Sequence, residues 1–250
     1  MTQTSQNKIA MVTCYDYAFA KALDGVCDYY LVGDSAGMVV YGDEDTKSMD
    51  MPTLLRHVRA VCRGAGKTKV VADLPIGSYA DIPLAQNNAA AFRKAGAFAV
   101  KLEGASDATL RAVRAIRADM PVMGHVGLTP QLLDDYKVQG KDEKSAQRIL
   151  EEALALQNGG CFAIVLECIP AALAQKITSL LRIPTIGIGA GPHCGGQVLV
   201  LYDLLGLYPD LKAKFVKPYA DLAVEAKKAV SEYVQEVKSG AFPEEKHSFK

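Results

Sequence analysis

Eight short apolar segments alternate with segments of helical periodicity along the 250-residue chain. This alternation, with short connectors between the segments, predicts an α/β fold with a parallel sheet, and eight such units can close into a single (β/α)8 barrel of the TIM type. The length is typical of one such barrel, and the sequence has no internal repeat or linker that would divide it. We therefore expect one domain over residues 1–250, ending in a polar tail at about 242–250. An open, doubly wound sheet is the main rival.

The strand segments are rich in Val, Ile, Leu and Ala, as expected for parallel strands that are buried on both faces. We expect strands at residues 9–14, 28–33, 68–73, 98–103, 120–125, 162–167, 183–189 and, most weakly, 214–217.

Helices are expected between the strands because apolar residues recur there at helical spacing. One helix covers residues 52–64, another follows the capping residue Ser106, and a third begins at Pro170. The clearest one runs over residues 222–238 and is followed by Gly240, a typical residue just beyond a helix end. We expect its apolar face to pack on the barrel.

Composition excludes several classes of function. The 28 basic side chains balance 28 acidic ones, so nothing indicates a surface for nucleic acid. No apolar stretch approaches the roughly 18 residues that span a bilayer. The six cysteines form no C-x-x-C pair and the N-terminal MTQTSQNK lacks a signal-peptide core, which predicts reduced thiols and a cytoplasmic protein.

Three predicted strands end in a carboxylate that is followed at once by a turn residue: Asp34 in LVGDS, Asp73 in VADLP and Glu103 in VKLEG. Because parallel strands of a barrel place their carboxyl ends at one mouth, we expect these three side chains to converge there. Oxygen ligands from separate strands suit Mg²⁺, whereas no His or Cys has the spacing of a zinc site. The alternative is that each carboxylate caps the following helix.

Lys101 lies two residues before Glu103, so both side chains point to the same face of their strand. A lysine beside a metal is well placed to bind the carboxylate of an anionic substrate. A simple internal ion pair between the two is the alternative.

Glu167 and His125 also lie at predicted strand ends. The apolar residues before Glu167 should favour its protonated form and make it our candidate for proton transfer; the alternative is a buried glutamate that backbone donors or a basic partner satisfy. His125 could bind substrate or hold a loop. The glycine-rich segment 187–196 could cradle an anion, but a tight turn with close packing is the favoured interpretation.

Several motifs, in order along the chain, resemble those of the ketopantoate (3-methyl-2-oxobutanoate) hydroxymethyltransferase family. They are TCYDYAFA (13–20), LVGDSAGMVVYG (31–42), VADLP (71–75), KLEG (101–104), GHVGLTP (124–130), YKVQG (136–140), VLEC (165–168), IPTIGIGAG (183–191) and the terminal EEKHSF.

This resemblance implies a Mg²⁺-dependent barrel enzyme of the phosphoenolpyruvate/pyruvate superfamily kind. It would move a one-carbon unit from 5,10-methylenetetrahydrofolate onto 2-oxoisovalerate, the first step towards pantothenate and coenzyme A. It also implies a homodecamer. The resemblance further implies the roles of the site residues: metal ligands Asp34, Asp73 and Glu103; substrate-binding residues Asp34, Ser35, Asp73, Lys101 and His125; and the general base Glu167.

Two segments depart from the family pattern. Only LLDD (132–135) separates Gln131 from YKVQG, and GDEDTKSMDM (42–51) is unusually acidic. We expect both segments near the active-site entrance, where they would affect the contacts with folate rather than the metal chemistry. Two other functions stay open: a carbon–carbon lyase or mutase of the phosphoenolpyruvate mutase type, and a non-catalytic barrel that binds a keto acid or folate.

Overall fold

The computed structural model describes residues 8–132, 137–208 and 213–249. The chain divides into two compact units, Met1–Val200 and Leu201–Lys250. The prediction of a single domain over residues 1–250 stays a prediction. The four residues 133–136, which include most of the LLDD segment and the start of YKVQG, lie outside the described residues.

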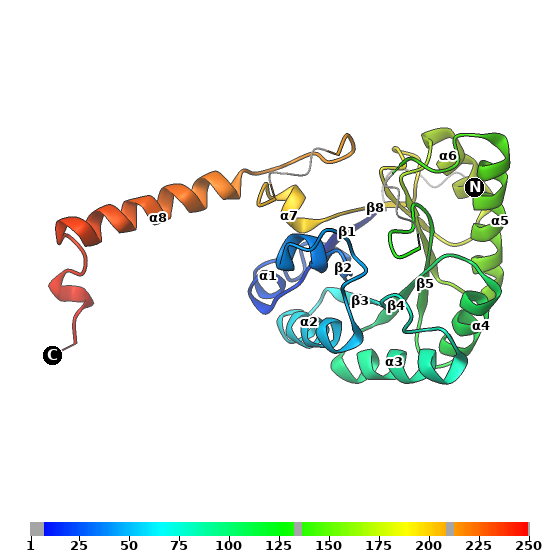
Figure 1. Cartoon of the computed structure of the whole chain (residues 1–250), viewed down its shortest axis with the longest axis horizontal. Coiled ribbons are helices and arrows are strands. Elements are labelled where there is room, and N and C mark those ends of the chain that lie inside the picture. The colour runs from blue at the N-terminus through cyan, green and yellow to red at the C-terminus, as the bar shows by residue number, and fades with distance from the viewer. Residues whose placement is uncertain (1–7, 133–136, 209–212, 250) are drawn as a thin grey trace. The chain divides into compact units, whose positions relative to one another are not determined.

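The first unit is a closed barrel of eight parallel strands, in which each strand pairs with the next one along the chain and β8 pairs with β1 (Figure 1). The strands are β1 (Ile9–Thr13), β2 (Tyr29–Val32), β3 (Lys69–Asp73), β4 (Ala99–Glu103), β5 (Val122–Gly127), β6 (Ala163–Glu167), β7 (Thr185–Ile188) and β8 (Gly196–Leu199). The predicted fold class is confirmed, and the first seven strands match their predicted segments.

The prediction of the eighth strand was wrong. Residues 214–217 form a turn and an irregular segment, and β8 instead begins at the end of the glycine-rich stretch 187–196. Gly196 explains the closure: a Cβ there would lie 2.5 Å from the carbonyl oxygen of Ile9, so only glycine lets β8 approach β1 closely. The favoured interpretation of these glycines, close packing, agrees with this geometry.

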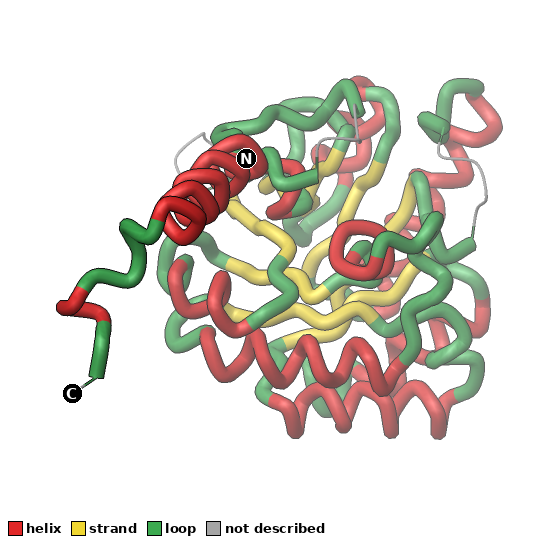
Figure 2. Tube along the Cα trace, turned by 60° about the vertical axis from the view of Figure 1, so that its left-hand side comes forward, coloured by secondary structure: helices red, strands yellow, loops and turns green. Residues whose placement is uncertain are grey.

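Helices surround the strands of this unit (Figure 2). They are α1 (Tyr17–Ala22), the π-helix η1 (Gly37–Tyr41), α2 (Met51–Gly64), α3 (Ile82–Ala95), α4 (Asp107–Ile116), α5 (Glu143–Gly159) and α6 (Ala171–Leu180). Short side chains cap most of them, as predicted for Ser106, whose Oγ accepts a hydrogen bond from the Thr109 amide at 3.1 Å. Pro170 is the N-cap residue of α6, as expected.

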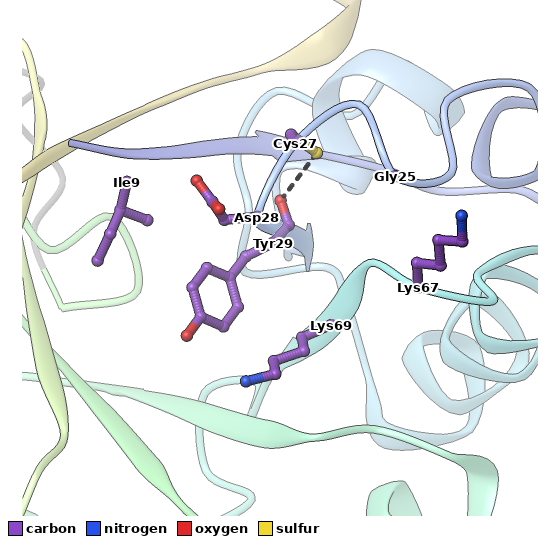
Figure 3. A pocket seen from close by; sticks show the side chains of 7 residues that line it. All are labelled: Ile9, Gly25, Cys27, Asp28, Tyr29, Lys67 and Lys69. Atoms are coloured by element: carbon purple, nitrogen blue, oxygen red, sulfur yellow. Dashed lines mark hydrogen bonds between the residues drawn. The ribbon is translucent and has the colours of Figure 1, made fainter. Parts of the chain in front are cut away.

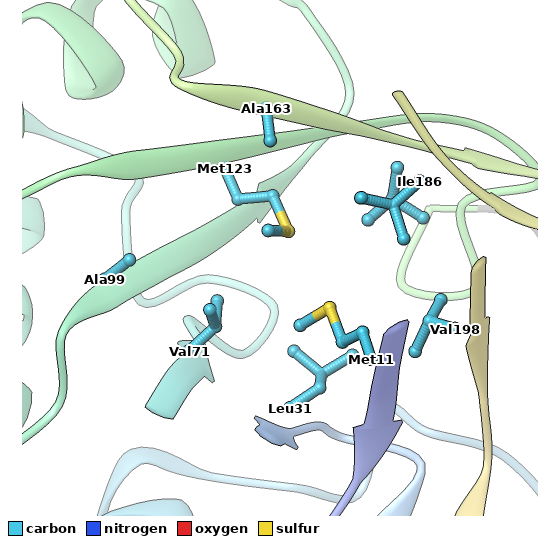
Figure 4. Close-up of a cluster of buried hydrophobic side chains, with 9 residues drawn as sticks. Met11, Leu31, Val71, Ala99, Met123, Ala163, Ile186 and Val198 are labelled. Atoms are coloured by element: carbon cyan, nitrogen blue, oxygen red, sulfur yellow. The ribbon is translucent and has the colours of Figure 1, made fainter. Parts of the chain in front are cut away.

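The barrel interior is filled by a layer of apolar side chains to which all eight strands contribute (Figure 4). The layer consists of Met11, Leu31, Val71, Ala99, Met123, Ala163, Val165, Ile186 and Val198. Because side chains on a strand alternate, the residue two positions after a member of this layer also points inward, nearer the carboxyl end. Asp73 follows Val71 in this way, Lys101 follows Ala99, and His125 follows Met123.

The second unit contains α7 (Leu201–Leu204), α8 (Leu222–Ser239) and a short 3₁₀ turn, η2 (Glu245–His247). Gly240 ends α8 in the left-handed conformation with φ 76°, as predicted. Packing of the apolar face of α8 on the barrel stays a prediction. In the polar tail, the Phe242 ring lies 5.6 Å from that of Tyr233, whereas Phe249 is fully exposed. Among the described residues, no helix combines the length and the apolar character that a membrane crossing requires.

Candidate active site

Six of the predicted site residues come together at the carboxyl ends of five neighbouring strands. Asp34 follows β2, Asp73 ends β3, Lys101 and Glu103 lie in β4, His125 lies in β5, and Glu167 ends β6. All except Glu167 are at most 6% exposed. Such a concentration of charge in a buried place has a high desolvation cost, which indicates a purpose other than stability.

The charged groups form a continuous network. Lys101 Nζ lies 3.0 Å from Asp73 Oδ1 and 3.5 Å from Glu103 Oε1. His125 Nδ1 lies 3.0 Å from the same oxygen, Glu103 Oε1, and 3.3 Å from Lys101 Nζ, while His125 Nε2 lies 3.2 Å from Glu167 Oε2. Lys101 and His125 therefore share Glu103, and His125 connects Glu103 to Glu167.

The two aspartates at one side of the network carry more negative charge than their surroundings neutralise. Burial, together with the charges of Asp73 and Glu103, raises the pKa of Asp34 well above its ordinary value. Burial also raises the pKa of Asp73, although the Lys101 ammonium opposes that change. A cation bound between these two carboxylates would relieve both effects.

The two basic groups keep their protons. Burial alone would lower the pKa of Lys101, but the carboxylates of Asp73, Glu103 and Asp34 outweigh it and raise that pKa. Burial and the Lys101 charge likewise act to lower the pKa of His125, yet its contacts with Glu103 and Glu167 raise it from 6.5 to about 9. Conversely, His125 and Lys101 outweigh burial at Glu103 and lower its pKa to about 2. The carboxylates of Glu103 and Glu167 thus favour the imidazolium form of His125.

Asp34 and Asp73 fit a hard divalent cation. Asp73 Oδ1 is buried and has no well-aligned hydrogen bond, although the Lys101 ammonium is close, and Mg²⁺ needs only one or two protein carboxylates beside water and substrate oxygens. Among the described residues, no three His, Cys, Asp or Glu side chains already converge as metal ligands. Glu103 is the third carboxylate nearby, but Lys101, His125 and the backbone N–H of Gln131 already contact its oxygens. Its direct ligation of a metal stays a prediction.

Ser35 and Glu167 differ in their surroundings from the buried network. Ser35 Oγ lies 2.8 Å from the hydroxyl of Tyr15 at the same barrel mouth. The side chain of Glu167 is 19% exposed and faces His125. Of the two kinds of partner considered for Glu167, backbone donors or a basic side chain, the structure shows the basic side chain, His125. The surroundings of Glu167 are less apolar than its neighbours in sequence indicate.

Sequence reasoning missed Gln131 and Tyr79. Gln131 Nε2 donates to Asp34 Oδ2 at 2.7 Å, and the Tyr79 hydroxyl donates to Gln131 Oε1 at 3.1 Å. Neither residue lies at a strand end, so the pattern that revealed the charged residues gave no signal for them. The only indication was that Gln131 directly follows the motif GHVGLTP (124–130) of the resembled family.

Two clefts lie at opposite ends of the barrel. The first, about 480 Å³, opens beside the network between the loops that follow β3, β4 and β5, and its lining includes Tyr79, Glu103 and Leu132. The second, about 430 Å³, lies at the amino-terminal end of the strands, where Tyr29 and Lys69 border it (Figure 3). The first cleft therefore lies beside the charged residues.

All six cysteines are free thiols, as predicted.

Comparison with known proteins identifies the family. A family model described as ketopantoate hydroxymethyltransferase matches residues 1–245. The chain belongs to the ketopantoate hydroxymethyltransferase family. Curated relatives named 3-methyl-2-oxobutanoate hydroxymethyltransferase include one from Carboxydothermus hydrogenoformans, 54% identical over 97% of this chain and 90% of that protein. Another, from Syntrophus aciditrophicus, is 51% identical over 97% and 91%. The chain is accordingly a transferase of one-carbon groups.

Solved structures agree on the fold of this family member. A 2,3-dimethylmalate lyase of the PEP mutase/isocitrate lyase superfamily has a TM-score of 0.61 at 16% identity, covering 99% of this chain and 88% of the other. A phosphonopyruvate hydrolase solved with oxalate and Mg²⁺ has a TM-score of 0.62 at 14% identity, covering 96% and 88%. At such low identity the likeness shows a shared barrel fold and nothing about the reaction.

Proposed function

We propose that this protein transfers a hydroxymethyl group from 5,10-methylenetetrahydrofolate to 3-methyl-2-oxobutanoate, giving 2-dehydropantoate for pantothenate synthesis. The observation that carries the proposal is the buried network of Asp34, Asp73, Lys101, Glu103 and His125 at the strand ends, which has the charges needed to bind and ionise a small 2-oxo acid. Membership of the family supports the choice of reaction.

Binding of the keto acid would use the positive side of the network. The Lys101 ammonium, held 3.0 Å from Asp73, would donate to the substrate carboxylate, and the hydroxyl of Ser35 would donate to a substrate oxygen. Asp34 and Asp73 would hold Mg²⁺, and Glu103 would support it. When bound, this cation supplies Lewis-acid polarisation of the keto group.

Glu167 would take the proton from C3 of the keto acid. His125 Nε2 lies 3.2 Å from Glu167 Oε2, and this contact would orient the carboxylate towards the substrate. The C–H electron pair then stays on the substrate as an enolate. Water would hydrolyse both carbon–nitrogen bonds of the methylene bridge, so that its two protons go to the two nitrogens of the released tetrahydrofolate and its oxygen stays on the one-carbon unit as formaldehyde. C3 of the enolate would then add to this carbon, and the proton taken by Glu167 would return to the new alkoxide to give the hydroxymethyl group.

The cleft of about 480 Å³ beside Glu103 would admit the folate, because its volume lies in the range of small-molecule sites. The alternative of a lyase or mutase of the phosphoenolpyruvate mutase type rests on fold likeness at 12–16% identity, far below the 48–54% of the transferase relatives. The homodecamer and the cytoplasmic location stay predictions.

Exchange of the C3 hydrogen of 3-methyl-2-oxobutanoate in D₂O, followed by NMR, tests the proposal. Exchange should require Mg²⁺, stop with EDTA, and fall at least 100-fold in Glu167→Gln. Glu151→Gln is the matched control because Glu151 is an exposed glutamate on α5, outside the network. Exchange without turnover of methylenetetrahydrofolate would favour a lyase or mutase, and no exchange in any condition, folate included, would favour a binding protein.

A further inference from the structure

Gln131 lies between three of the strand ends that carry the charged network. Its Nε2 donates to Asp34 Oδ2 at 2.7 Å and to the carbonyl oxygen of Leu74 at 3.1 Å. Its Oε1 accepts from the Tyr79 hydroxyl at 3.1 Å, and its backbone N–H donates to Glu103 Oε2 at 3.1 Å. The residue is 2% exposed, so no solvent competes for these contacts.

The chemistry of the neighbours fixes the orientation of this amide. A carboxylate and a backbone carbonyl can only accept, so the NH₂ group must face Asp34 and Leu74, and the oxygen is left to accept from Tyr79. Both N–H groups and the oxygen are therefore paired. Rotation of the amide would set oxygen against oxygen and leave a buried donor without an acceptor, which is costly.

This arrangement leaves one oxygen of Asp34 for a cation. Gln131 holds Oδ2, and the cation can approach the other oxygen. Without the amide, the Asp34 carboxylate would lie buried near Asp73 and Glu103 with its only described side-chain donor removed, and repulsion would favour its turning away. Through its backbone, the same residue also fixes Glu103 relative to Asp34.

We propose that Gln131 is a positioning residue that holds the Asp34 and Glu103 carboxylates in the arrangement a divalent cation requires. The inference rests on the proposed metal site and deepens it, because residues that orient metal ligands typically contribute 10- to 100-fold to affinity. Tyr79 contributes indirectly, because its hydroxyl donates to the side-chain oxygen of Gln131 and so fixes the orientation of that amide.

Binding of Mn²⁺ to the full chain, measured by the EPR signal of free Mn²⁺, tests this role apart from activity. Gln131→Met keeps the approximate shape but removes the donors and should weaken Mn²⁺ binding about 10- to 100-fold. Gln131→Glu places a second carboxylate against Asp34 and should also weaken Mn²⁺ binding. Gln86→Met is the matched control, because Gln86 is exposed on α3, and its affinity should stay within about twofold.

The outcomes separate this inference from the proposed function. If the wild-type chain binds no Mn²⁺, the proposed metal site itself fails. If the wild type binds and folded Gln131→Met binds within twofold of it, the metal site stands and the positioning role is overturned, even where the melting temperature drops. Should Gln131→Met not fold, Tyr79→Phe decides: a loss of about threefold or more supports the role, and unchanged affinity overturns it.

Discussion

Protonation of His125 should make the stability of the metal-free protein depend on pH in a defined window. Its contacts with Glu103 and Glu167 raise its pKa from 6.5 to about 9. Because the folded state holds this proton more tightly than the unfolded chain, the resulting stability is fully present below pH 6.5 and is lost as pH rises to about 9. The interval between 6.5 and 9, at about 1.4 kcal/mol per pH unit, corresponds to about 3 kcal/mol.

Urea unfolding in EDTA, at half-unit steps from pH 6 to 10, measures this effect. Wild type should lose about 3 kcal/mol of unfolding free energy more than His125→Gln over the window, because the variant has no imidazolium to lose. His193→Gln serves as the control, since His193 is an exposed histidine, and its curve should run parallel to that of wild type. Parallel curves for wild type and His125→Gln would refute the reasoning.

Three further substitutions test separate parts of the structure. Asp34→Asn should abolish the rise in melting temperature that we expect from Mg²⁺. It should not lower the melting temperature of the metal-free protein, because it removes repulsion with Asp73; a lower value would contradict that repulsion. Ser106→Ala should lower the unfolding free energy in urea by about 1 kcal/mol and leave Mn²⁺ affinity unchanged, since it removes the helix cap and the hydroxyl contact with Thr109, both outside the charged network. Gly196→Ala should cost about 2 kcal/mol or more in the same assay, because its Cβ would meet the backbone of Ile9; a cost below about 0.5 kcal/mol would show that the closure tolerates a side chain.

The strand ends could be predicted from the sequence because the relevant information is local. An apolar run that ends in a charged residue marks a strand end, and the period of two places Lys101 and Glu103 on one face. Closure of a parallel barrel then brings Asp34, Asp73 and Glu103 to the same mouth without any knowledge of distances.

The eighth strand and the amide of Gln131 could not be predicted for the opposite reason. GQVL in β8 is four residues long and begins with a glycine that looks like a turn residue, and its role appears only when the Ile9 backbone lies beside it. Gln131 contacts Asp34 across 97 positions of the chain, so nothing in its neighbourhood indicates the bond. The partner of Glu167 was missed likewise, because His125 reaches it only through the pairing of β5 with β6.

The formal charges of the network explain why its parts depend on each other. Asp34, Asp73, Glu103 and Glu167 carry four negative charges against two positive charges on Lys101 and His125, an excess of two that a divalent cation would balance. Lys101 and His125 are both needed beside Glu103. This glutamate is only 2% exposed and lies near two aspartates, and the two positive charges keep it ionised. The substrate carboxylate would then find Lys101 partly released from Asp73 once that aspartate faces a metal. Binding of the cation would thereby prepare the lysine for the keto acid, which predicts that 3-methyl-2-oxobutanoate binds measurably more weakly by calorimetry when Mg²⁺ is withheld.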